Sequence, residues 1–326
     1  MLSRMIKISL YVIATLSVCS IGIVLLISRP TYVFSVDDKT EEFIDLEKLK
    51  EHVLHLSTTF VPRNSSNLED LNSASEYIKN KLSETTKNVT YQEYNVGDRR
   101  YRNVIASFGP ETEEVTIVGA HYDAYSELPG ADDNASGVAG LIELGRLLNT
   151  VELKQQVLLV AYTLEEPPYF ASENMGSFVH ASSLEGKKVR IMISLEMIGY
   201  FSDKPDSQDF PISLLSLVYP NQGNFIAIVD KFKTNDAVGL KSSINKYTDL
   251  PAYSINAPIN IVGIDFSDHR NYWHFGYPAV MVTDTSFYRN KAYHTEHDTY
   301  DRLNYKLMAK VVFGVFKYVQ EINGKT

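Results

Sequence analysis

The stretch from Val115 to Leu148 constrains the fold of this chain more than any other part of the sequence. Its first four residues are β-branched and mostly apolar, which predicts a short buried strand. A polar loop follows, with His121 at its start and the acidic pair Asp132-Asp133 further on, and apolar residues then recur on one helical stripe. Strand, loop and helix in this order indicate an α/β sheet, in which ligands bind at the carboxyl ends of the strands. An acidic loop in that position predicts a bound cation.

Three further apolar runs are each associated with side chains of the kind that bind metals. The runs cover residues 155–163, 189–200 and 277–285, and we predict a buried strand in each of them. Because the carboxyl ends of neighbouring parallel strands share one edge of a sheet, the side chains at these ends are expected to converge. The acidic or histidine residues at or beyond these ends are Glu165, Glu166, Glu196 and His294.

The chemistry of the expected cluster points to a pair of divalent cations. Nitrogen and oxygen ligands without thiolate suit zinc, manganese or cobalt. Two histidines and three carboxylates exceed the needs of one catalytic zinc and fit two cations that share a bridging carboxylate. Of the pair Glu165-Glu166, one can bind metal while the other acts as general base. Asp123 is spaced to hold the second ring nitrogen of a metal-bound His121. The five candidate ligands are His121, Asp133, Glu166, Glu196 and His294.

The remainder of the chain adds further elements around this core. The segment 201–263 contains no metal motif, and we expect it to hold a late strand–helix unit and loops that shape a substrate pocket. Aromatic residues there and in 285–293 favour a bulky apolar residue in the substrate. Helical periodicity predicts helices within 31–60 and over 67–84. Strands are expected over 88–94 and 101–108.

Residues 1–30 form a separate unit. The run from Ser9 to Ser28 has no charged residue and is long enough, as a helix, to span a hydrocarbon layer of ~30 Å. Arg4 and Lys7 precede it, which favours a cytoplasmic N-terminus. A cleaved signal peptide is the alternative, although its apolar region is normally shorter. We therefore expect a transmembrane helix that anchors an exported domain, or a secreted protein if the segment is removed.

Residues 31–326 are numerous enough for one large α/β domain or two small ones, and we assign them to the catalytic part of the chain. The only cysteine, Cys19, lies in the apolar run, so the remainder has no internal disulfide. A net charge of −9 argues against nucleic acid as the partner. The sequence leaves the oligomeric state open.

Six short motifs resemble those of the zinc-dependent exopeptidases that include bacterial leucine aminopeptidases, glutamate carboxypeptidase II and the transferrin receptor ectodomain. The resemblance implies a three-layer α/β/α fold with a central mixed, mostly parallel sheet and a metal site at the carboxyl ends of its strands. It also implies a metallo-aminopeptidase that uses two zinc ions to hydrolyse peptides. The motifs follow the order of that family: AHYD (120–123), PGADDNASGVA (129–139), EE (165–166), SLEMIG (194–199), SDH (267–269) and YHTEHDT (293–299).

The same resemblance implies a role for each site residue. Glu165 would be the general base, and Tyr293 would steady the tetrahedral intermediate. Many family members have aspartate at the position of Glu196, which is one methylene longer, so the metal spacing could differ here. The implied ligands are His121 and Glu196 for the first zinc ion and His294 for the second, with Glu166 as a further metal ligand. Asp133 would bridge the two ions, with a cis peptide to Asn134.

Three other functions are compatible with these motifs. A glutaminyl cyclase shares the fold, uses one zinc and forms pyroglutamate, although the SGVA context at 136–139 is closer to the hydrolases. A carboxypeptidase would differ in pocket residues that the sequence does not identify. A non-enzymatic ectodomain would have lost metal ligands, whereas all five positions here hold competent ones.

Neighbouring polar residues also have structural interpretations. Asp132 is expected to be solvated or to support its loop. The pair Asp268-His269 either lies behind the metal ligands or begins a helix, whereas His297 and Asp298 are expected to be structural. We leave His180 outside the site.

Overall fold

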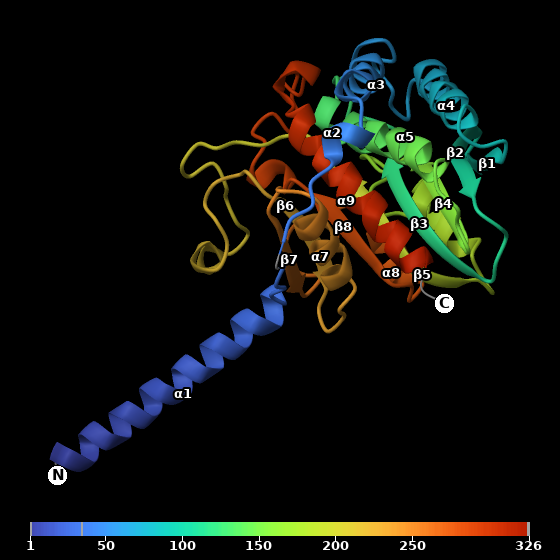
Figure 1. The fold of residues 1–326 in the computed structure, drawn as a ribbon. Helices are drawn as coiled ribbons and strands as arrows, with labels where there is room; N and C mark the ends of the chain where they lie inside the picture. Colours follow the sequence, from blue (N-terminus) through green and yellow to red (C-terminus); the bar gives the residue numbers. More distant parts are fainter. Residues whose placement is uncertain (1, 34, 325–326) are drawn as a thin grey trace.

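The computed structural model describes residues 2–33 and 35–324, and within them an eight-stranded sheet forms the centre of the fold (Figure 1). The strand order is β1-β2-β4-β3-β5-β8-β6-β7. Four of the seven neighbouring pairs are parallel and three are antiparallel, so the expected mixed, mostly parallel sheet is confirmed. The strands are β1 (Val89–Val96), β2 (Arg99–Phe108), β3 (Glu114–His121), β4 (Gln156–Tyr162), β5 (Lys188–Glu196), β6 (Ile226–Lys231), β7 (Ala252–Ala257) and β8 (Ala279–Thr283).

Helices cover both faces of this sheet, which gives the expected three layers (Figure 1). Helices α3, α4, α5, α7 and α9 bury their apolar stripes in one large core on one face. Helices α6 and α8 contribute to a smaller core on the other face. The helices are α1 (Leu2–Ser28), α2 (Thr40–Phe43), α3 (Leu46–Thr58), α4 (Leu68–Ser83), α5 (Gly137–Leu148), α6 (Gly176–Ser182), α7 (Ala237–Tyr247), α8 (His269–His274) and α9 (Tyr305–Asn323).

The strand register brings the candidate site residues to one edge of the sheet. His121, at the end of β3, pairs with Tyr162 at the end of β4, and Glu196, at the end of β5, pairs with Thr283 of β8. Between these strands and α5, Gly137 lies so close to β5 that an added Cβ would be 2.6 Å from the carbonyl oxygen of Leu195. Glycine at this position therefore lets the acidic loop before α5 approach the end of β5.

Most elements that the sequence patterns predict are present. The strands expected over 88–94 and 101–108 form the antiparallel pair β1 and β2. The segment 201–263 contains β6, α7 and β7, together with the short 3₁₀ turn η2 (Ser213–Leu217). We predicted no element after His294, yet the long helix α9 closes the large core there.

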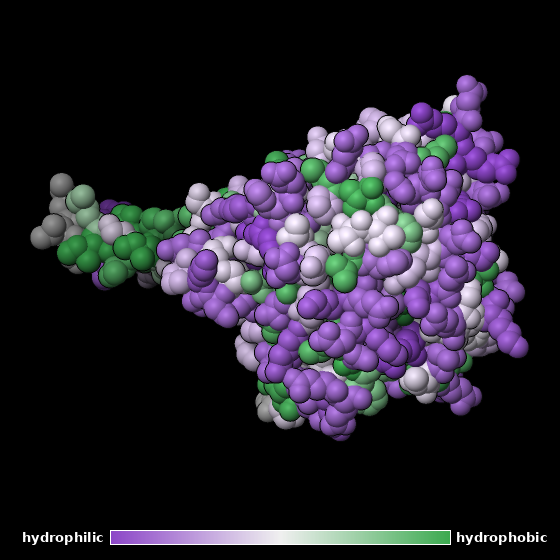
Figure 2. All heavy atoms as spheres, turned by 90° about the horizontal axis from the view of Figure 1, so that it is seen from above, coloured by the Kyte–Doolittle hydropathy of each residue, from purple (hydrophilic) through white to green (hydrophobic). Residues whose placement is uncertain are grey.

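The N-terminal helix α1 leaves the domain as a single rod (Figure 1). Its stretch from Arg4 to Ser28 is long and apolar enough to cross a membrane, a test that a signal sequence near an N-terminus also passes. Figure 2 shows apolar residues over much of this rod, whereas the visible face of the domain is mostly hydrophilic.

Candidate metal centre and active site

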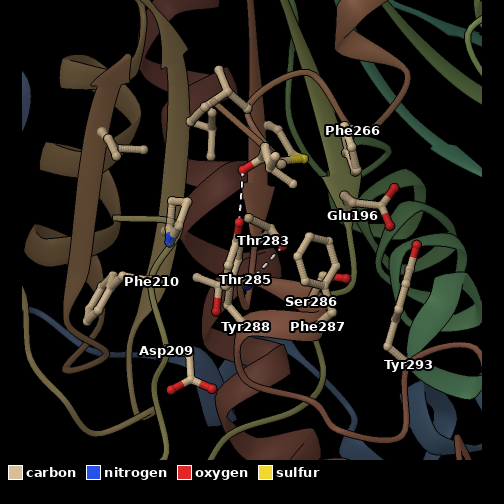
Figure 3. A pocket seen from close by; sticks show the side chains of 18 of the residues that line it. Glu196, Asp209, Phe210, Phe266, Thr283, Thr285, Ser286, Phe287, Tyr288 and Tyr293 are labelled. Carbon is tan, nitrogen blue, oxygen red and sulfur yellow. Dashed lines mark hydrogen bonds between the residues drawn. The ribbon is translucent and has the colours of Figure 1, made fainter. Parts of the chain in front are cut away.

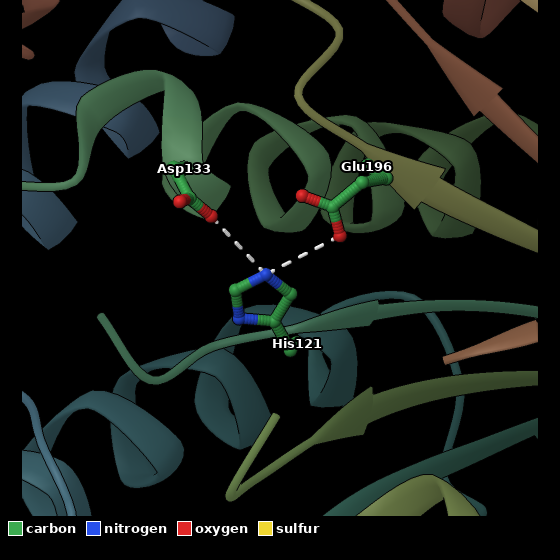
Figure 4. Close-up of side chains that lie close together, drawn as sticks. All are labelled: His121, Asp133 and Glu196. Atoms are coloured by element: carbon green, nitrogen blue, oxygen red, sulfur yellow. Dashed lines mark ion pairs between the residues drawn. The ribbon is translucent and has the colours of Figure 1, made fainter. Parts of the chain in front are cut away.

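Three of the five candidate ligands meet around His121. Its Nε2 atom lies 3.3 Å from Oδ1 of Asp133 and 3.4 Å from Oε2 of Glu196 (Figure 4). These residues come from the end of β3, the turn at Ala131–Ser136 and the end of β5. All three are buried, and their ligand atoms are close enough together to hold one metal ion.

The other two candidates meet around the same aspartate. Nε2 of His294 lies 3.1 Å from Oδ2 of Asp133 and 3.2 Å from Oε2 of Glu166. Asp133 thus presents one oxygen to each histidine, which is the arrangement of a carboxylate that bridges two ions. The peptide bond between Asp133 and Asn134 is cis, as the resemblance implies.

The buried polar atoms of this cluster fit a pair of divalent cations. Nε2 of His121, Nε2 of His294 and Oε1 of Glu166 have no hydrogen-bond partner among the described residues. A buried polar atom without a partner is costly, and several carboxylates in one buried cluster repel one another. Imidazole nitrogens and carboxylate oxygens in this number suit two zinc ions.

Without a cation, these groups depart from their ordinary protonation. Burial opposes the charged form of His294, but the carboxylates of Asp133 and Glu166 outweigh it and raise its pKa to about 10. Burial raises the pKa of Glu166 to about 8, and the charge of Asp133 acts in the same direction. Burial also raises the pKa of Asp133, but the contacts of its carboxylate with the two histidines outweigh burial and leave that pKa below its ordinary value. Such shifts are common where a site is built for an added charge.

Asp123 connects the end of β3 with the turn after β4. The carbonyl oxygen of Asp123 lies 3.1 Å from Nδ1 of His121, and its carboxylate lies 3.6 Å from the same nitrogen. The carboxylate also accepts hydrogen bonds from the backbone N–H groups of Glu165 and Glu166, at 3.2 and 3.1 Å. Asp123 therefore orients the imidazole of His121 through its backbone carbonyl and the turn after β4 through its carboxylate.

Asp132 is not a solvated loop residue, because it is fully buried. Its Oδ1 accepts a hydrogen bond from the N–H of Gly199, and its Oδ2 accepts one from the side chain of Asn290. Asp298, expected to be structural, accepts hydrogen bonds from the backbone N–H groups of Asp132 and Asp133. Both carboxylates therefore support the loop that presents the bridging aspartate.

Arg63 is a buried support for the same loop that the sequence patterns did not indicate. Its guanidinium donates to the carbonyl oxygens of Pro129 and Gly130, and its Nε donates to that of Tyr122 at 2.9 Å. Gly130 has a φ of 56°, and an added Cβ there would lie 2.2 Å from the carbonyl oxygen of Asp133. Arginine and glycine together thus fix the backbone immediately before the site.

Two tyrosines enclose the imidazole of His294. The ring of Tyr125 stacks on the imidazole with centroids 4.0 Å apart, and the ring of Tyr293 stacks on it with centroids 3.8 Å apart. Tyr125 was not among the predicted site residues. On the side of the other histidine, Ser267 donates a hydrogen bond of 2.7 Å to Oε2 of Glu196. Neighbouring side chains therefore restrict the orientation of both candidate ligands.

The other polar residues of the motifs are not among the groups that could hold a metal ion. His269 lies at the start of α8 and its Nε2 lies 2.8 Å from the carbonyl oxygen of Ile264. Asp268 is fully buried, and neither of its carboxylate oxygens has a hydrogen-bond partner among the described residues. His180 is buried beside Tyr272, away from the cluster, whereas the side chain of His297 is 75% exposed.

A cavity of about 270 Å³ opens beside the cluster. Glu165 is buried at its edge, with Oε2 3.9 Å from Nε2 of His121, and burial raises its pKa well above the ordinary value. Figure 3 shows Glu196 and Tyr293 on one side of the cavity and Phe210 on the other. The remaining wall is mainly apolar and includes Leu215, Tyr219, Phe225, Ala227, Tyr253 and Met281. The cavity can therefore hold a bulky apolar group next to the cluster.

Fold and site together define an α/β protein with a candidate two-cation centre at the carboxyl edge of its sheet. Residues 103–319 match Peptidase family M28, and the chain belongs to this family.

Two relatives each match most of the chain. The chain is 49% identical over 278 residues to "Uncharacterized protein YfbL" of Escherichia coli, covering 82% of this chain and 86% of that protein. It is 26% identical over 317 residues to "Probable aminopeptidase YDR415C" of Saccharomyces cerevisiae, covering 88% and 78%.

Among solved structures, LapB of Legionella pneumophila has the same fold, with a TM-score of 0.71, 20% identity, and coverage of 88% of this chain and 74% of LapB. A glutaminyl cyclase of Porphyromonas gingivalis also has it, with a TM-score of 0.64, 17% identity, and coverage of 86% and 99%. The fold therefore does not by itself distinguish between these activities.

Proposed function

We propose that the protein is a metal-dependent aminopeptidase that removes N-terminal residues from peptides. The observation that carries the proposal is the position of Asp133 between two histidines, with Glu165 beside the cluster and an apolar cavity adjoining it. Membership of Peptidase family M28 supports peptide hydrolysis, and a relative with the name of a probable aminopeptidase supports the more specific activity. We assign the catalytic domain to residues 31–326.

Each site residue has a distinct role in this proposal. His121 and Glu196 would hold one zinc ion, Glu166 and His294 the other, and Asp133 both. When bound, the two ions would polarise the scissile carbonyl and lower the pKa of an attacking water. Glu165 would accept the proton of that water and return it to the leaving amine nitrogen. The hydroxyl of Tyr293 would donate a hydrogen bond to the carbonyl oxygen as it becomes negative.

The raised pKa of Glu165 supports its role as a base and acid in turn. Burial and neighbouring carboxylates favour its protonated form, and bound cations would act in the opposite direction and lower its pKa again. A group with a pKa near the working pH can both take up and return a proton. Glu173, which is exposed, lacks this environment.

The adjoining cavity supports a bulky apolar residue at the N-terminus of the substrate. Its wall has many aromatic and aliphatic side chains and few charged ones outside the metal cluster. Burial of an apolar side chain is favourable by ~25 cal/mol per Å² of apolar surface removed from water. Substrates with leucine, phenylalanine or tyrosine in first position are therefore expected to be preferred over alanine.

One experiment separates the proposal from its alternatives. Peptides with a free N-terminus, a blocked N-terminus or an N-terminal glutamine are incubated with the zinc-loaded protein, with and without chelator, and their products are weighed by mass spectrometry. The proposal predicts chelator-sensitive loss of one N-terminal residue from unblocked peptides only. Loss of ammonia from the glutamine peptide would indicate a glutaminyl cyclase, an activity found among solved structures with this fold. Loss of a C-terminal residue would indicate a carboxypeptidase.

We also propose that α1 remains attached and anchors the catalytic domain outside the cytoplasm. The length and composition of Arg4–Ser28 support a membrane span. The two basic residues before the apolar run, Arg4 and Lys7, support a cytoplasmic N-terminus. The intact mass of the purified membrane protein tests this, because processing of a signal peptide would remove the first residues.

A further inference from the structure

Lys241 of α7 joins the catalytic domain to the end of α1. The residue is buried, with 4% of its surface exposed, and its Nζ donates hydrogen bonds to the carbonyl oxygens of Ser28 and Arg29. The third acceptor is Oγ of Ser254 in β7, at 2.8 Å. The last carbonyls of a helix have no partner within the helix, and a cation at that end is favourable. Lys241 therefore binds the carboxyl end of α1.

Ser254 makes the same connection from the edge strand β7. Its hydroxyl donates a hydrogen bond of 3.0 Å to the carbonyl oxygen of Ser28. Removal of the chain up to and including Arg29 would leave the Lys241 ammonium with Ser254 as the only one of its three acceptors, which is unfavourable. The two side chains thus bind the carboxyl end of α1.

An exposed apolar turn lies on the side of the molecule from which α1 leaves. The loop between β5 and β6, yellow in Figure 1, projects on the side from which α1 leaves. It carries the 3₁₀ turn η2, in which the residues Leu214 and Leu217 are 70% and 81% exposed. Residues three apart in a 3₁₀ turn lie on the same face. Two leucines that point together into water are unfavourable unless something covers them.

Hydrogen bonds connect this loop to Ser254 and through it to the end of α1. The hydroxyl of Tyr219, two residues after η2, donates to the carbonyl oxygen of Ser254 at 2.8 Å. Ser254 in turn contacts Ser28, the last residue of α1. Leu215, between the two exposed leucines, turns inward and lines the cavity. One short turn therefore separates the cavity from an apolar outer surface close to the end of α1.

We propose that Ile212, Leu214 and Leu217 form a membrane contact patch that rests on the bilayer crossed by α1. If α1 spans that bilayer, its carboxyl end lies at the membrane surface, and the loop tied to that end by Tyr219 and Ser254 lies at the same surface. Ile212 is 43% exposed and extends the apolar area. The catalytic domain is then held at the membrane by two contacts and has one orientation rather than rotating freely about a tether.

Lipid quenching of a fluorescent label tests the patch in the full chain. A Cys19→Ser background leaves no other thiol, so a bimane label can be attached at Leu214→Cys or Leu217→Cys. Asp98→Cys is the matched control, because it is exposed in the turn beside β1, the edge strand farthest from β7 in the sheet. Leu25→Cys in α1 reports insertion. Each variant is reconstituted in phosphatidylcholine vesicles that contain phosphatidylcholine with a nitroxide near the headgroup.

The proposal predicts that lipid nitroxide quenches the labels at 214 and 217 at least twofold more than the label at 98. Equal quenching at 214 and 98, with strong quenching at 25, would overturn it. A label at 214 that is shielded from aqueous iodide but not quenched by lipid would also overturn it and would indicate a second copy of the chain on the patch. Absence of quenching at 25 would remove its premise that α1 spans the bilayer.

Discussion

The guanidinium of Arg63 donates a hydrogen bond of 2.6 Å to the carbonyl oxygen of Gly130, a residue 67 positions away in the chain. Further hydrogen bonds from the same side chain reach the carbonyl oxygens of Leu56, Tyr122 and Pro129. Arg63 thus ties α3, the end of β3 and the acidic loop together. The geometry of Asp133 at the candidate centre depends on this connection.

Substitution of Arg63 by methionine is therefore expected to reduce both stability and metal affinity. Each buried carbonyl left without a donor costs ~1–3 kcal/mol, so the free energy of unfolding should fall by about 3 kcal/mol or more. Urea unfolding and zinc titration measure the two effects. Arg100→Met is the control, because Arg100 is exposed in β2. Equal behaviour of the two variants would contradict the role of Arg63.

Glu165→Gln should leave the candidate metal centre intact while it removes the proposed base. The amide has nearly the same shape but cannot accept the proton of the attacking water, and such a loss typically lowers turnover by ~10²–10⁴-fold. Metal content is measured by elemental analysis and turnover with a leucyl chromogenic substrate. Glu173→Gln, at an exposed position, should match the unchanged protein. Full turnover in Glu165→Gln would exclude this residue from the mechanism.

Zinc binding should release protons near neutral pH. In the metal-free protein the pKa of His294 is raised to about 10 and that of Glu166 to about 8, so both groups carry protons at pH 7. A metal ligand must be deprotonated, so affinity should increase as pH rises from about 6 to 8. Calorimetry in two buffers that differ in ionisation enthalpy measures the protons released.

Two histidine variants provide the comparison for this measurement. His294→Gln should bind zinc more weakly and release fewer protons, whereas His297→Gln, at a side chain that is 75% exposed, should behave like the unchanged protein. Identical binding enthalpies in both buffers would show that no proton is released and would contradict the proposed protonation of the metal-free cluster.

The apolar cavity should determine which first residue the enzyme prefers. Ala227 of β6 lines the cavity, and Ala227→Phe would fill part of it. We expect kcat/KM for a phenylalanyl substrate to fall by roughly tenfold or more, with a much smaller change for an alanyl substrate. Leu214→Phe, on the outer side of the cavity wall, should leave both values unchanged. Parallel losses for both substrates would argue against a specificity role for the cavity.

The sequence patterns predicted most of the strands, though not β7, and the candidate ligands, because both signals are local. A buried strand is an apolar run, and a candidate ligand is the polar residue that ends it, as with His121 at the end of β3 and Glu196 at the end of β5. The strand register then brings these ends together, although they are far apart in the chain.

Residues that hold the candidate site in place through tertiary contacts could not be predicted in this way. Arg63 has no local pattern that distinguishes it from a surface arginine, and the stacking of Tyr125 on His294 joins two loops. The buried state of Asp132 likewise follows from Gly199 and Asn290, which are distant in sequence. Helix α9 is different, since its apolar periodicity from Met308 onward is a local signal that predicts a helix.

Crystallographic location of zinc in the metal-loaded protein, by anomalous scattering at the zinc absorption edge, tests the central claim most directly. The account predicts two peaks that share Asp133, one also bound by His121 and Glu196 and the other by Glu166 and His294. Elemental analysis of the same sample should give two zinc ions per chain. A single peak, or peaks away from these five side chains, would contradict the account.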